Sequence, residues 1–380
     1  MTATRSNLEA MEKAFGEALC PEDVFGALNG SSLEQLGALK AQLRSFTRVC
    51  HPDNALPEDK DLATRVFQAL SRWEVIARQK IESGTYGDKR PDAASPAYTP
   101  VQLLVRGKTL TLSGLLAKGI FADVHAAQYE DEAQGALFVK YARDVADNDL
   151  LEREFSVLKS LHLPDANPEA EAFFVSQRAY VPFPVTSFSV RDENKAKHRA
   201  NLLRVPTGRC FTAETLRRDK FPDGIEPKHV WWIFRRLLLT LWMAHLKGFI
   251  HGAVTPDHVL VFPEEHGLVL LDWTCAAKIE EEHVPAINPA FEEFYAPELL
   301  RKEVASPSAD LFMAASTIIW MLGGNPGARR IPDTVPEALK QALLCCLDPV
   351  ARRRPPDAEA FHNEFGNLLG KRVYAHMVIP

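Results

Sequence analysis

Residues 249–262 read FIHGAVTPDHVLVF and residues 268–274 read LVLLDWT, and these two segments say most about the fold. Three segments follow them: FYAPELL at 294–300, SADLFMAAST at 308–317 and DPVARRRP at 348–355. Three more precede them: LSGLLAKGIFADVHAAQ at 112–128, GALFVKYAR at 135–143 and LLEREFSVLKSL at 150–161. The preceding group predicts two strands, with Lys140 at the end of the second, and then an amphipathic helix.

In this order, the segments resemble the protein-kinase fold over about residues 105–370. The resemblance implies a bilobal domain that binds nucleotide. Ala117, Gly119 and Ala122 occupy the three glycine positions of the family's phosphate-covering loop, so only Gly119 is kept. Alanine adopts a positive φ at a cost, and we therefore expect a stiffer loop that approaches phosphates less closely.

The resemblance also implies a set of nucleotide-binding residues. Lys140 stands where the family lysine holds the phosphates, and Glu154 is its expected helix partner, with Glu152 as the fallback. Asp272 stands at the main metal-ligand position. ATP with Mg²⁺ is the implied cofactor, with weak or absent binding.

The segment that starts at His251 departs from the family pattern H-R-D-L-K-P-E-N. The functional positions that differ are Gly252, Ala253, Thr255 and His258. Ala253 replaces the catalytic base, and a methyl group cannot accept a proton, a loss of roughly 10²–10⁴ in rate. His258 replaces the metal-binding asparagine, although Mg²⁺ prefers oxygen ligands. Asp257 is a neighbouring carboxylate and a weaker candidate for the base.

Residues of the family scaffold are kept. Glu298 and Arg354 are expected to form an ion pair, and Asp310 to open a central helix. The resemblance therefore implies a pseudokinase, with impaired catalysis, that binds a client or partner or senses nucleotide. The first alternative is an atypical ATP-dependent kinase or other nucleotide transferase that uses Lys140, Glu154 and Asp272. The second is a scaffold that binds neither chaperone nor nucleotide.

The first 88 residues are almost all compatible with helix. Ser31 and Glu34 form a capping box that opens a helix, and its apolar stripe consists of Leu33, Leu36, Leu39, Leu43, Phe46 and Val49. Off that stripe, Lys40, Arg44 and Arg48 recur every four residues and align on an exposed face.

His51-Pro52-Asp53 follows this helix. Proline disfavours helical geometry in the residue before it, so we expect the helix to end at His51. A second helix then carries Ala63, Val66, Phe67, Leu70, Trp73 and Ile76 or Ala77. Residues 20–88 resemble the J-domain of DnaJ-type co-chaperones. The resemblance implies that His51, Pro52 and Asp53 stimulate the ATPase of a DnaK-type heat-shock chaperone. Lys40, Arg44 and Arg48 would then steer its acidic surface.

Composition sets the outer limits. The 380 residues are 46% apolar and carry a net charge of −6, which argues against a general nucleic-acid binder. No run of the sequence is apolar enough to span a membrane, so we expect no membrane partner. The six cysteines lack the spacing of a metal site or of a disulfide framework, and we therefore expect a cytoplasmic protein. We predict the α+β class, with a J-domain over 1–88, a linker over 89–104 and a kinase-like domain over 105–375.

Overall fold

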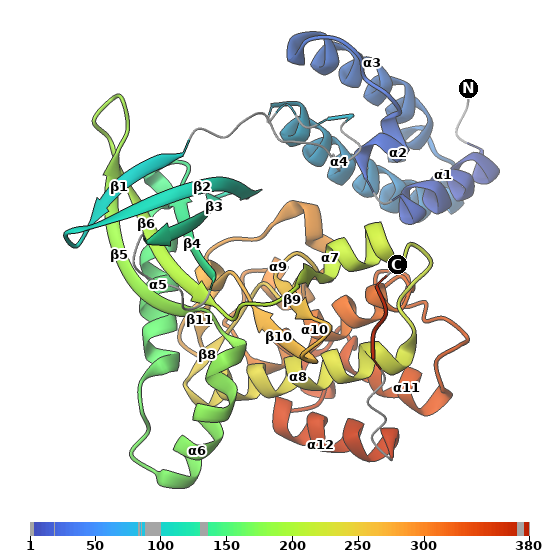
Figure 1. Ribbon diagram of the computed structural model, residues 1–380. Helices are drawn as coiled ribbons and strands as arrows, with labels where there is room; N and C mark the ends of the chain where they lie inside the picture. Colours follow the sequence, from blue (N-terminus) through green and yellow to red (C-terminus); the bar gives the residue numbers. More distant parts are fainter. Residues whose placement is uncertain are drawn as a thin grey trace. The chain divides into compact units, whose positions relative to one another are not determined.

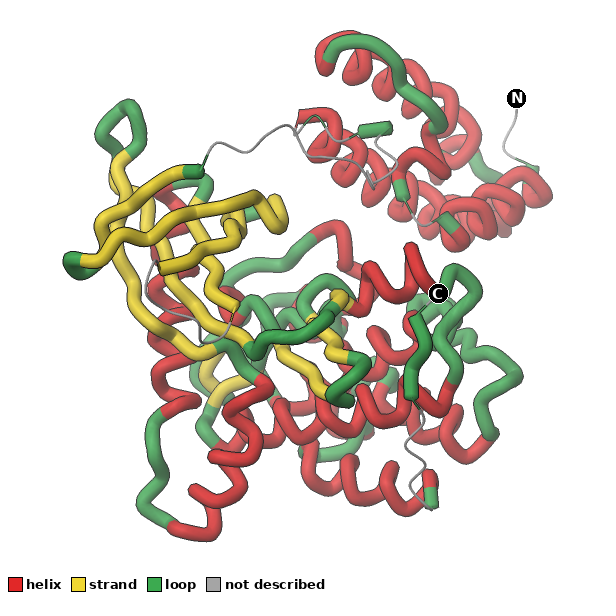
Figure 2. The backbone as a smooth tube through the Cα atoms, viewed as in Figure 1, coloured by secondary structure: helices red, strands yellow, loops and turns green. Residues whose placement is uncertain are grey.

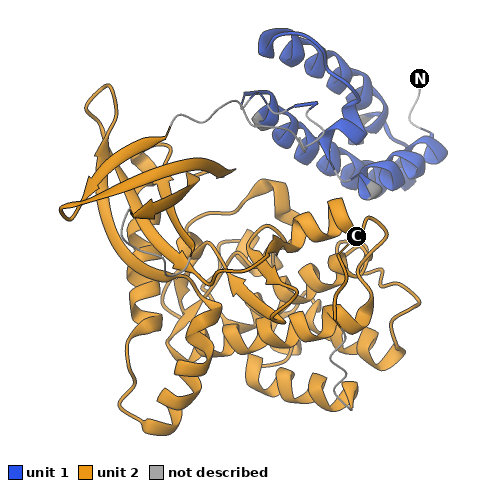
Figure 3. Cartoon of the chain, viewed as in Figure 1, with its two compact units in different colours: residues 1–96 blue, residues 97–380 orange. Residues whose placement is uncertain are grey.

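The computed structural model describes residues 4–18, 20–82, 84, 86–87, 100–129, 136–370 and 376–379. The chain divides into two compact units, Met1–Pro96 and Ala97–Pro380 (Figure 3). The described part of the first unit is helical, and the second unit combines a curled antiparallel sheet with helices. The predicted α+β class is therefore confirmed.

The described helices of the first unit are α1 (Arg5–Glu17), α2 (Pro21–Phe25), α3 (Ser32–Cys50) and α4 (Lys60–Glu82), with 3-10 turns η1 (Pro52–Asn54) and η2 (Pro57–Asp59) between α3 and α4. The predicted capping box opens α3, where the backbone N–H and the hydroxyl of Ser31 donate to Glu34 Oε2 at 2.8 and 2.7 Å. His51 closes α3, because its N–H donates to the carbonyl of Thr47 before Pro52 begins η1.

The apolar stripe of α3 packs against α4 to form the core of this unit. Of the predicted stripe, Leu36, Leu39, Leu43 and Phe46 pack in this core, where Cys50 joins them, while Val49 is half-buried outside it. The side chains of α4 in the core include Ala63, Val66, Phe67, Leu70, Trp73 and Ala77. The prediction for Leu33 was wrong, since its exposed fraction is 81%. A helix turns about 100° per residue, which carries Leu33 about 100° away from the centre of the stripe.

The second unit begins with a six-stranded antiparallel sheet in the order β1-β2-β3-β4-β6-β5 (Figure 1). The strands are β1 (Val101–Val105), β2 (Lys108–Lys118), β3 (Ala122–Tyr129), β4 (Ala136–Ala142), β5 (Phe183–Arg191) and β6 (Lys197–Val205). Residues 112–128, predicted as one strand, belong to two. The chain reverses at Gly119, whose N–H donates to the Ala122 carbonyl at 2.9 Å.

The rest of the second unit is mainly helical, and Figure 2 shows the six-stranded sheet gathered at one end of it. The helices are α5 (Asn148–His162), α6 (Pro168–Gln177), α7 (Ala213–Thr215), α8 (Pro227–Leu246), α9 (Pro297–Leu300), α10 (Pro307–Met321), α11 (Glu337–Cys346) and α12 (Ala358–Leu369). Short strands β7 (Phe211–Thr212), β9 (Val259–Phe262) and β10 (Gly267–Leu270) form one small sheet, and β8 (Phe249–Ile250) and β11 (Ala277–Lys278) form another.

Three features of this unit differ from the prediction or were missed by it. Of the predicted linker over 89–104, residues 89–99 lie outside the described residues, and residues 101–104 belong to β1. Helix α6 was not predicted. The domain was expected to end at residue 375, but Met377 is only 2% exposed and packs into the main core. None of the described helices has the length and apolar character needed to cross a membrane.

Candidate functional site

Three of the predicted nucleotide-binding residues meet in the second unit. Lys140 Nζ on β4 lies 3.0 Å from Glu154 Oε1 on α5 and 2.8 Å from Asp272 Oδ1, just before η6 (Trp273–Cys275). Asn201 on β6 pairs with Lys140 across the sheet, and its amide donates to Glu154 Oε2 at 3.0 Å. We call Lys140, Glu154, Asp272, Asp257 and His258 the Lys140 cluster.

Glu154 is the helix partner of Lys140, and the fallback Glu152 has another role. Glu152 lies 3.0 Å from Arg199 on β6 and its side chain is 67% exposed. Two residues of a helix separated by two positions point about 200° apart, so both cannot face β4. Glu154 is 1% exposed and points inward.

Charge pairing shifts the pKa values of this cluster. Burial alone would lower the pKa of Lys140, but the carboxylates of Asp272 and Glu154 raise it above its usual value. Burial would raise the pKa of Asp272, but Lys140 and His258 hold it well below its usual range. Lys140 is therefore a cation and Asp272 an anion near neutral pH.

Asp310 on α10 holds the segment that starts at His251 in place. Asp310 accepts the backbone N–H groups of His251 and Gly252 at 2.7 and 2.9 Å, and also lies 3.0 Å from His245 Nε2. The His251 ring is buried, with Nε2 donating to the Leu271 carbonyl at 2.8 Å. His251 is thus an anchor of the loop.

The structure explains why glycine occupies position 252, which the sequence did not reveal. Its φ is +73°, and a Cβ there would lie 2.6 Å from the carbonyl oxygen of Cys275. Arginine, the family residue at this position, would therefore be strained and would clash. Glycine at position 252 thus suits both the positive φ and the close approach of the Cys275 carbonyl.

Ala253 and His258 shape the other side of the cluster. Ala253 is 1% exposed and contributes its carbonyl, which accepts a hydrogen bond from His258 Nδ1 at 2.8 Å. His258 Nε2 lies 3.4 Å from Asp257 Oδ2 and 3.5 Å from Asp272 Oδ2. Burial would lower the pKa of His258, but these two carboxylates raise it above its usual value.

Asp257 belongs to the cluster, although it was predicted only as a weaker candidate for the base. The Thr255 hydroxyl donates to Asp257 Oδ1 at 2.6 Å, which leaves Oδ2 facing His258. Burial raises the pKa of Asp257 above its usual range, with the charge of His258 opposing the shift. Its side chain remains 28% exposed. The position of Asp257 directly before His258 gave no sequence signal of this orientation.

The cluster does not fit Mg²⁺. Asp272 Oδ1 already accepts from Lys140 and from the hydroxyl of Thr274, and Oδ2 faces the ring of His258. Mg²⁺ needs oxygen ligands in an octahedron, and His258 offers no oxygen. The predicted metal role of Asp272 is therefore not supported. Among the described residues no group of three His, Cys, Asp or Glu side chains is placed to hold a metal ion.

Gly119 lies in the turn between β2 and β3, where its N–H is used within the turn. A Cβ at this position would lie 2.6 Å from the carbonyl oxygen of Ala122, so the close approach of the two backbones requires glycine. Its carbonyl accepts from Arg143 Nη1 at 3.0 Å. Gly119 thus has a structural role in the turn, and its predicted contact with phosphate stays a prediction.

The predicted scaffold pair is present. Arg354 donates to both carboxylate oxygens of Glu298, at 2.6 and 2.8 Å, and both side chains are buried. Its Nη1 also donates to the Ser308 carbonyl at 3.1 Å, which ties the chain after α11 to α9 and α10.

In the first unit, the predicted chaperone-binding residues lie around a groove between α3 and α4. Its volume is about 420 Å³, and it is lined by Lys40, Leu43, Arg44, Thr47, Arg48, Phe67, Leu70, Ser71, Glu74 and Arg78. His51 stands beside it, with its ring edge-to-face on Phe67 at 5.1 Å between centroids. Pro52 opens η1, and the side chain of Asp53 lies outside the described residues.

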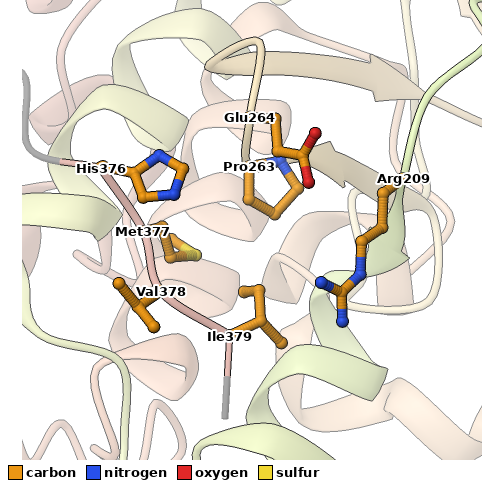
Figure 4. Close-up of a pocket in the computed structure, with 7 residues that line it drawn as sticks. All are labelled: Arg209, Pro263, Glu264, His376, Met377, Val378 and Ile379. Carbon is orange, nitrogen blue, oxygen red and sulfur yellow. The ribbon is translucent and has the colours of Figure 1, made fainter.

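A smaller cavity of about 160 Å³ lies elsewhere in the second unit (Figure 4). It is lined by Arg209, Pro263, Glu264, His376, Met377, Val378 and Ile379. Residues 376–379 thus lie beside the turn between β9 and β10. None of the residues predicted for a site lines this cavity.

The sequence was compared with models of known protein families, and no family model matches it.

Proposed function

We propose that the chain is a J-domain co-chaperone that stimulates the ATPase of a DnaK-type heat-shock chaperone. The observation that carries the proposal is the groove of the first unit. Lys40, Arg44 and Arg48 line it, and His51 packs on Phe67 beside it. The groove thus combines cations with apolar side chains next to the His-Pro-Asp turn.

An acidic partner surface suits this groove. All three cations of α3 are exposed, so they attract such a surface over a distance of about 8–10 Å at physiological salt. Long-range attraction of this kind raises the rate of association more than it raises the final affinity. Contact with Phe67, which is only partly buried, then supplies an apolar part of the interface.

The second unit is, in this proposal, a kinase-like module with impaired catalysis that binds a client or partner or senses nucleotide. Its support is the chemistry of the Lys140 cluster. Ala253 offers no side-chain proton acceptor, and His258 stands in place of an oxygen ligand. Glu298, Arg354 and Asp310 meanwhile make the bonds expected of an intact scaffold.

A nucleotide transferase is the second candidate, since Lys140, Glu154 and Asp272 are held together by hydrogen bonds. Incubation with radiolabelled ATP tests it. Label transferred to protein by the wild type, and lost in Asp272→Ala, would favour the transferase. No transfer with either Mg²⁺ or Mn²⁺ would argue against it.

The co-chaperone activity is tested with a purified DnaK-type chaperone and its ATP turnover. The wild-type chain is expected to raise the turnover rate severalfold, and His51→Gln to abolish the stimulation. Folding of the variant is checked by circular dichroism. Equal stimulation by His51→Gln would refute the proposal for the first unit.

The basic face is tested separately by reversing one charge. Arg44→Glu is expected to reduce stimulation about tenfold at low salt, with a smaller loss at high salt because ions screen the attraction. Lys13→Glu is the matched control, because Lys13 is an exposed cation on α1 outside the groove. Equal losses in both variants would show that net charge, and not the groove, is responsible.

A further inference from the structure

The carboxylate of Asp272 is already satisfied by groups of the protein. Lys140 and the Thr274 hydroxyl donate to Oδ1, and the Thr274 backbone N–H donates to the same atom at 3.3 Å. Asp272 itself has a φ of +59°, a left-handed conformation that is uncommon for a residue other than glycine. The surrounding bonds therefore hold this side chain toward Lys140.

The ring of His258 lies on the other side of Asp272. Its Nδ1 faces the Ala253 carbonyl at 2.8 Å, and its Nε2 faces carboxylate oxygens of Asp257 and Asp272 at 3.4 and 3.5 Å. A carbonyl and a carboxylate only accept, so both ring nitrogens face acceptors. The ring thus lies within 3.5 Å of both carboxylates.

Compared with the family pattern, Ala253 and His258 together make the site more positive by two charges, which is the charge of one divalent ion. The family pattern has an aspartate at the position of Ala253 and a neutral asparagine at that of His258. Loss of the first removes a negative charge, and an imidazolium at the second adds a positive one. Phosphate stabilisation depends on such charges more than on covalent chemistry.

We propose that the Lys140 cluster binds the phosphate groups of a nucleotide without a divalent cation, with His258 in the place of the ion. This inference rests on the proposal that the second unit binds nucleotide. The side chains of His258, Asp257 and Asp272 are 16%, 28% and 27% exposed, so solvent reaches the cluster. Phosphate oxygens would accept from Lys140 and His258 directly.

The test measures binding of a fluorescent ATP analogue to the full-length chain by anisotropy, once in EDTA and once in excess Mg²⁺. For the wild type we expect dissociation constants that agree within about twofold. His258→Asn restores the amide, and we expect its affinity to be about tenfold weaker in EDTA than in Mg²⁺. Lys140→Ala should lose binding under both conditions, which assigns the signal to this cluster.

Two results would overturn the inference. Wild-type binding that is tenfold or more tighter with Mg²⁺ would show that an ion enters the site, and would leave nucleotide binding itself intact. No binding in either condition would remove nucleotide sensing from the proposed function as well. The chaperone assay with His51→Gln decides the first unit independently of both. If His258→Asn does not fold, the wild-type comparison still decides, because it needs no variant.

Discussion

Arg354 shows how a single residue can hold several segments of the second unit together. It forms a bidentate ion pair with Glu298, and its other donors reach the carbonyls of Ser308 and Asp348. Its guanidinium also lies 4.8 Å from the centre of the Phe312 ring. Because both side chains of the pair are buried, loss of Arg354 would leave the Glu298 carboxylate buried without its charge partner.

Arg354→Met is expected to lower the free energy of unfolding of the second unit by roughly 3–5 kcal/mol, since Glu298 would remain buried without its partner. Urea unfolding followed by circular dichroism measures the change. The double variant with Glu298→Leu should recover a large part of the loss, because it removes the unpaired charge. A single variant within about 1 kcal/mol of the wild type would contradict this prediction.

His251 gives the second unit a pH dependence of known sign. Burial lowers its pKa to about 4, with the charge of His258 acting in the same direction and Asp310 and Asp272 opposing. Between pH 6.5 and about 4 the unfolded chain therefore binds a proton that the folded chain does not. Stability falls as the pH falls through this range, by roughly 3 kcal/mol from this group.

Urea unfolding of the wild type and His251→Gln at several pH values between about 6.5 and about 4.5 measures this contribution. The variant should lose less stability on acidification, because glutamine does not titrate. The other histidines remain in both proteins, and His258, whose pKa is raised, is charged in both states over most of this range. Parallel curves for the two proteins would contradict the assignment.

At the scale of elements, α3 illustrates how one helix serves two purposes. Its inner stripe, with Leu39 and Leu43 buried, packs on α4, while its outer face carries the three cations of the groove. The two faces follow from the period of 3.6 residues per turn. The stripe stabilises the hairpin of helices, and the hairpin in turn places His51 beside Phe67.

Leu39→Ala and Leu33→Ala test the packing of α3 with the same substitution on the same helix. Leu39 is 1% exposed, and its loss should destabilise the first unit by roughly 2–5 kcal/mol through the cavity left behind. Leu33 is 81% exposed, so its variant should stay within about 0.5 kcal/mol of the wild type. Thermal unfolding compares the two. Similar effects of both would mean that helix propensity outweighs packing.

At the scale of the whole molecule, the second unit uses the end of the chain as part of its core. Met377 packs into the cluster that also contains residues of α8, α10 and α12, while Val378 beside it is 73% exposed. The chain end also lines the small cavity with Arg209 and Glu264 (Figure 4). Residues 376–379 are thus part of the folded unit.

Met377→Ala should lower the stability of the second unit by roughly 2–5 kcal/mol, because it removes a buried side chain. Val378→Ala is the matched control and should change stability by less than about 0.5 kcal/mol. Chemical unfolding of full-length variants measures both. No difference between them would show that the chain end does not pack in solution as it does here.

Local features of the fold follow directly from the amino-acid sequence. The period of α3, its capping box and its end at His51 follow from neighbours along the chain, and these were predicted correctly. The pairs of Lys140 with Glu154 and of Glu298 with Arg354 were predicted from a resemblance in motif order. Leu33 was misplaced because spacings of three and four drift around the helix.

Features that depend on residues far apart in the chain were visible only in the folded structure. The carbonyl of Cys275 leaves no space for a Cβ at Gly252, and Met377 is buried in a cluster that includes residues of α8, α10 and α12. The environment of His258 arises because Asp272, from the loop after β10, approaches the loop that carries Asp257 and His258. Such approaches are set by packing of the whole unit, whereas caps and periods are set within a few residues.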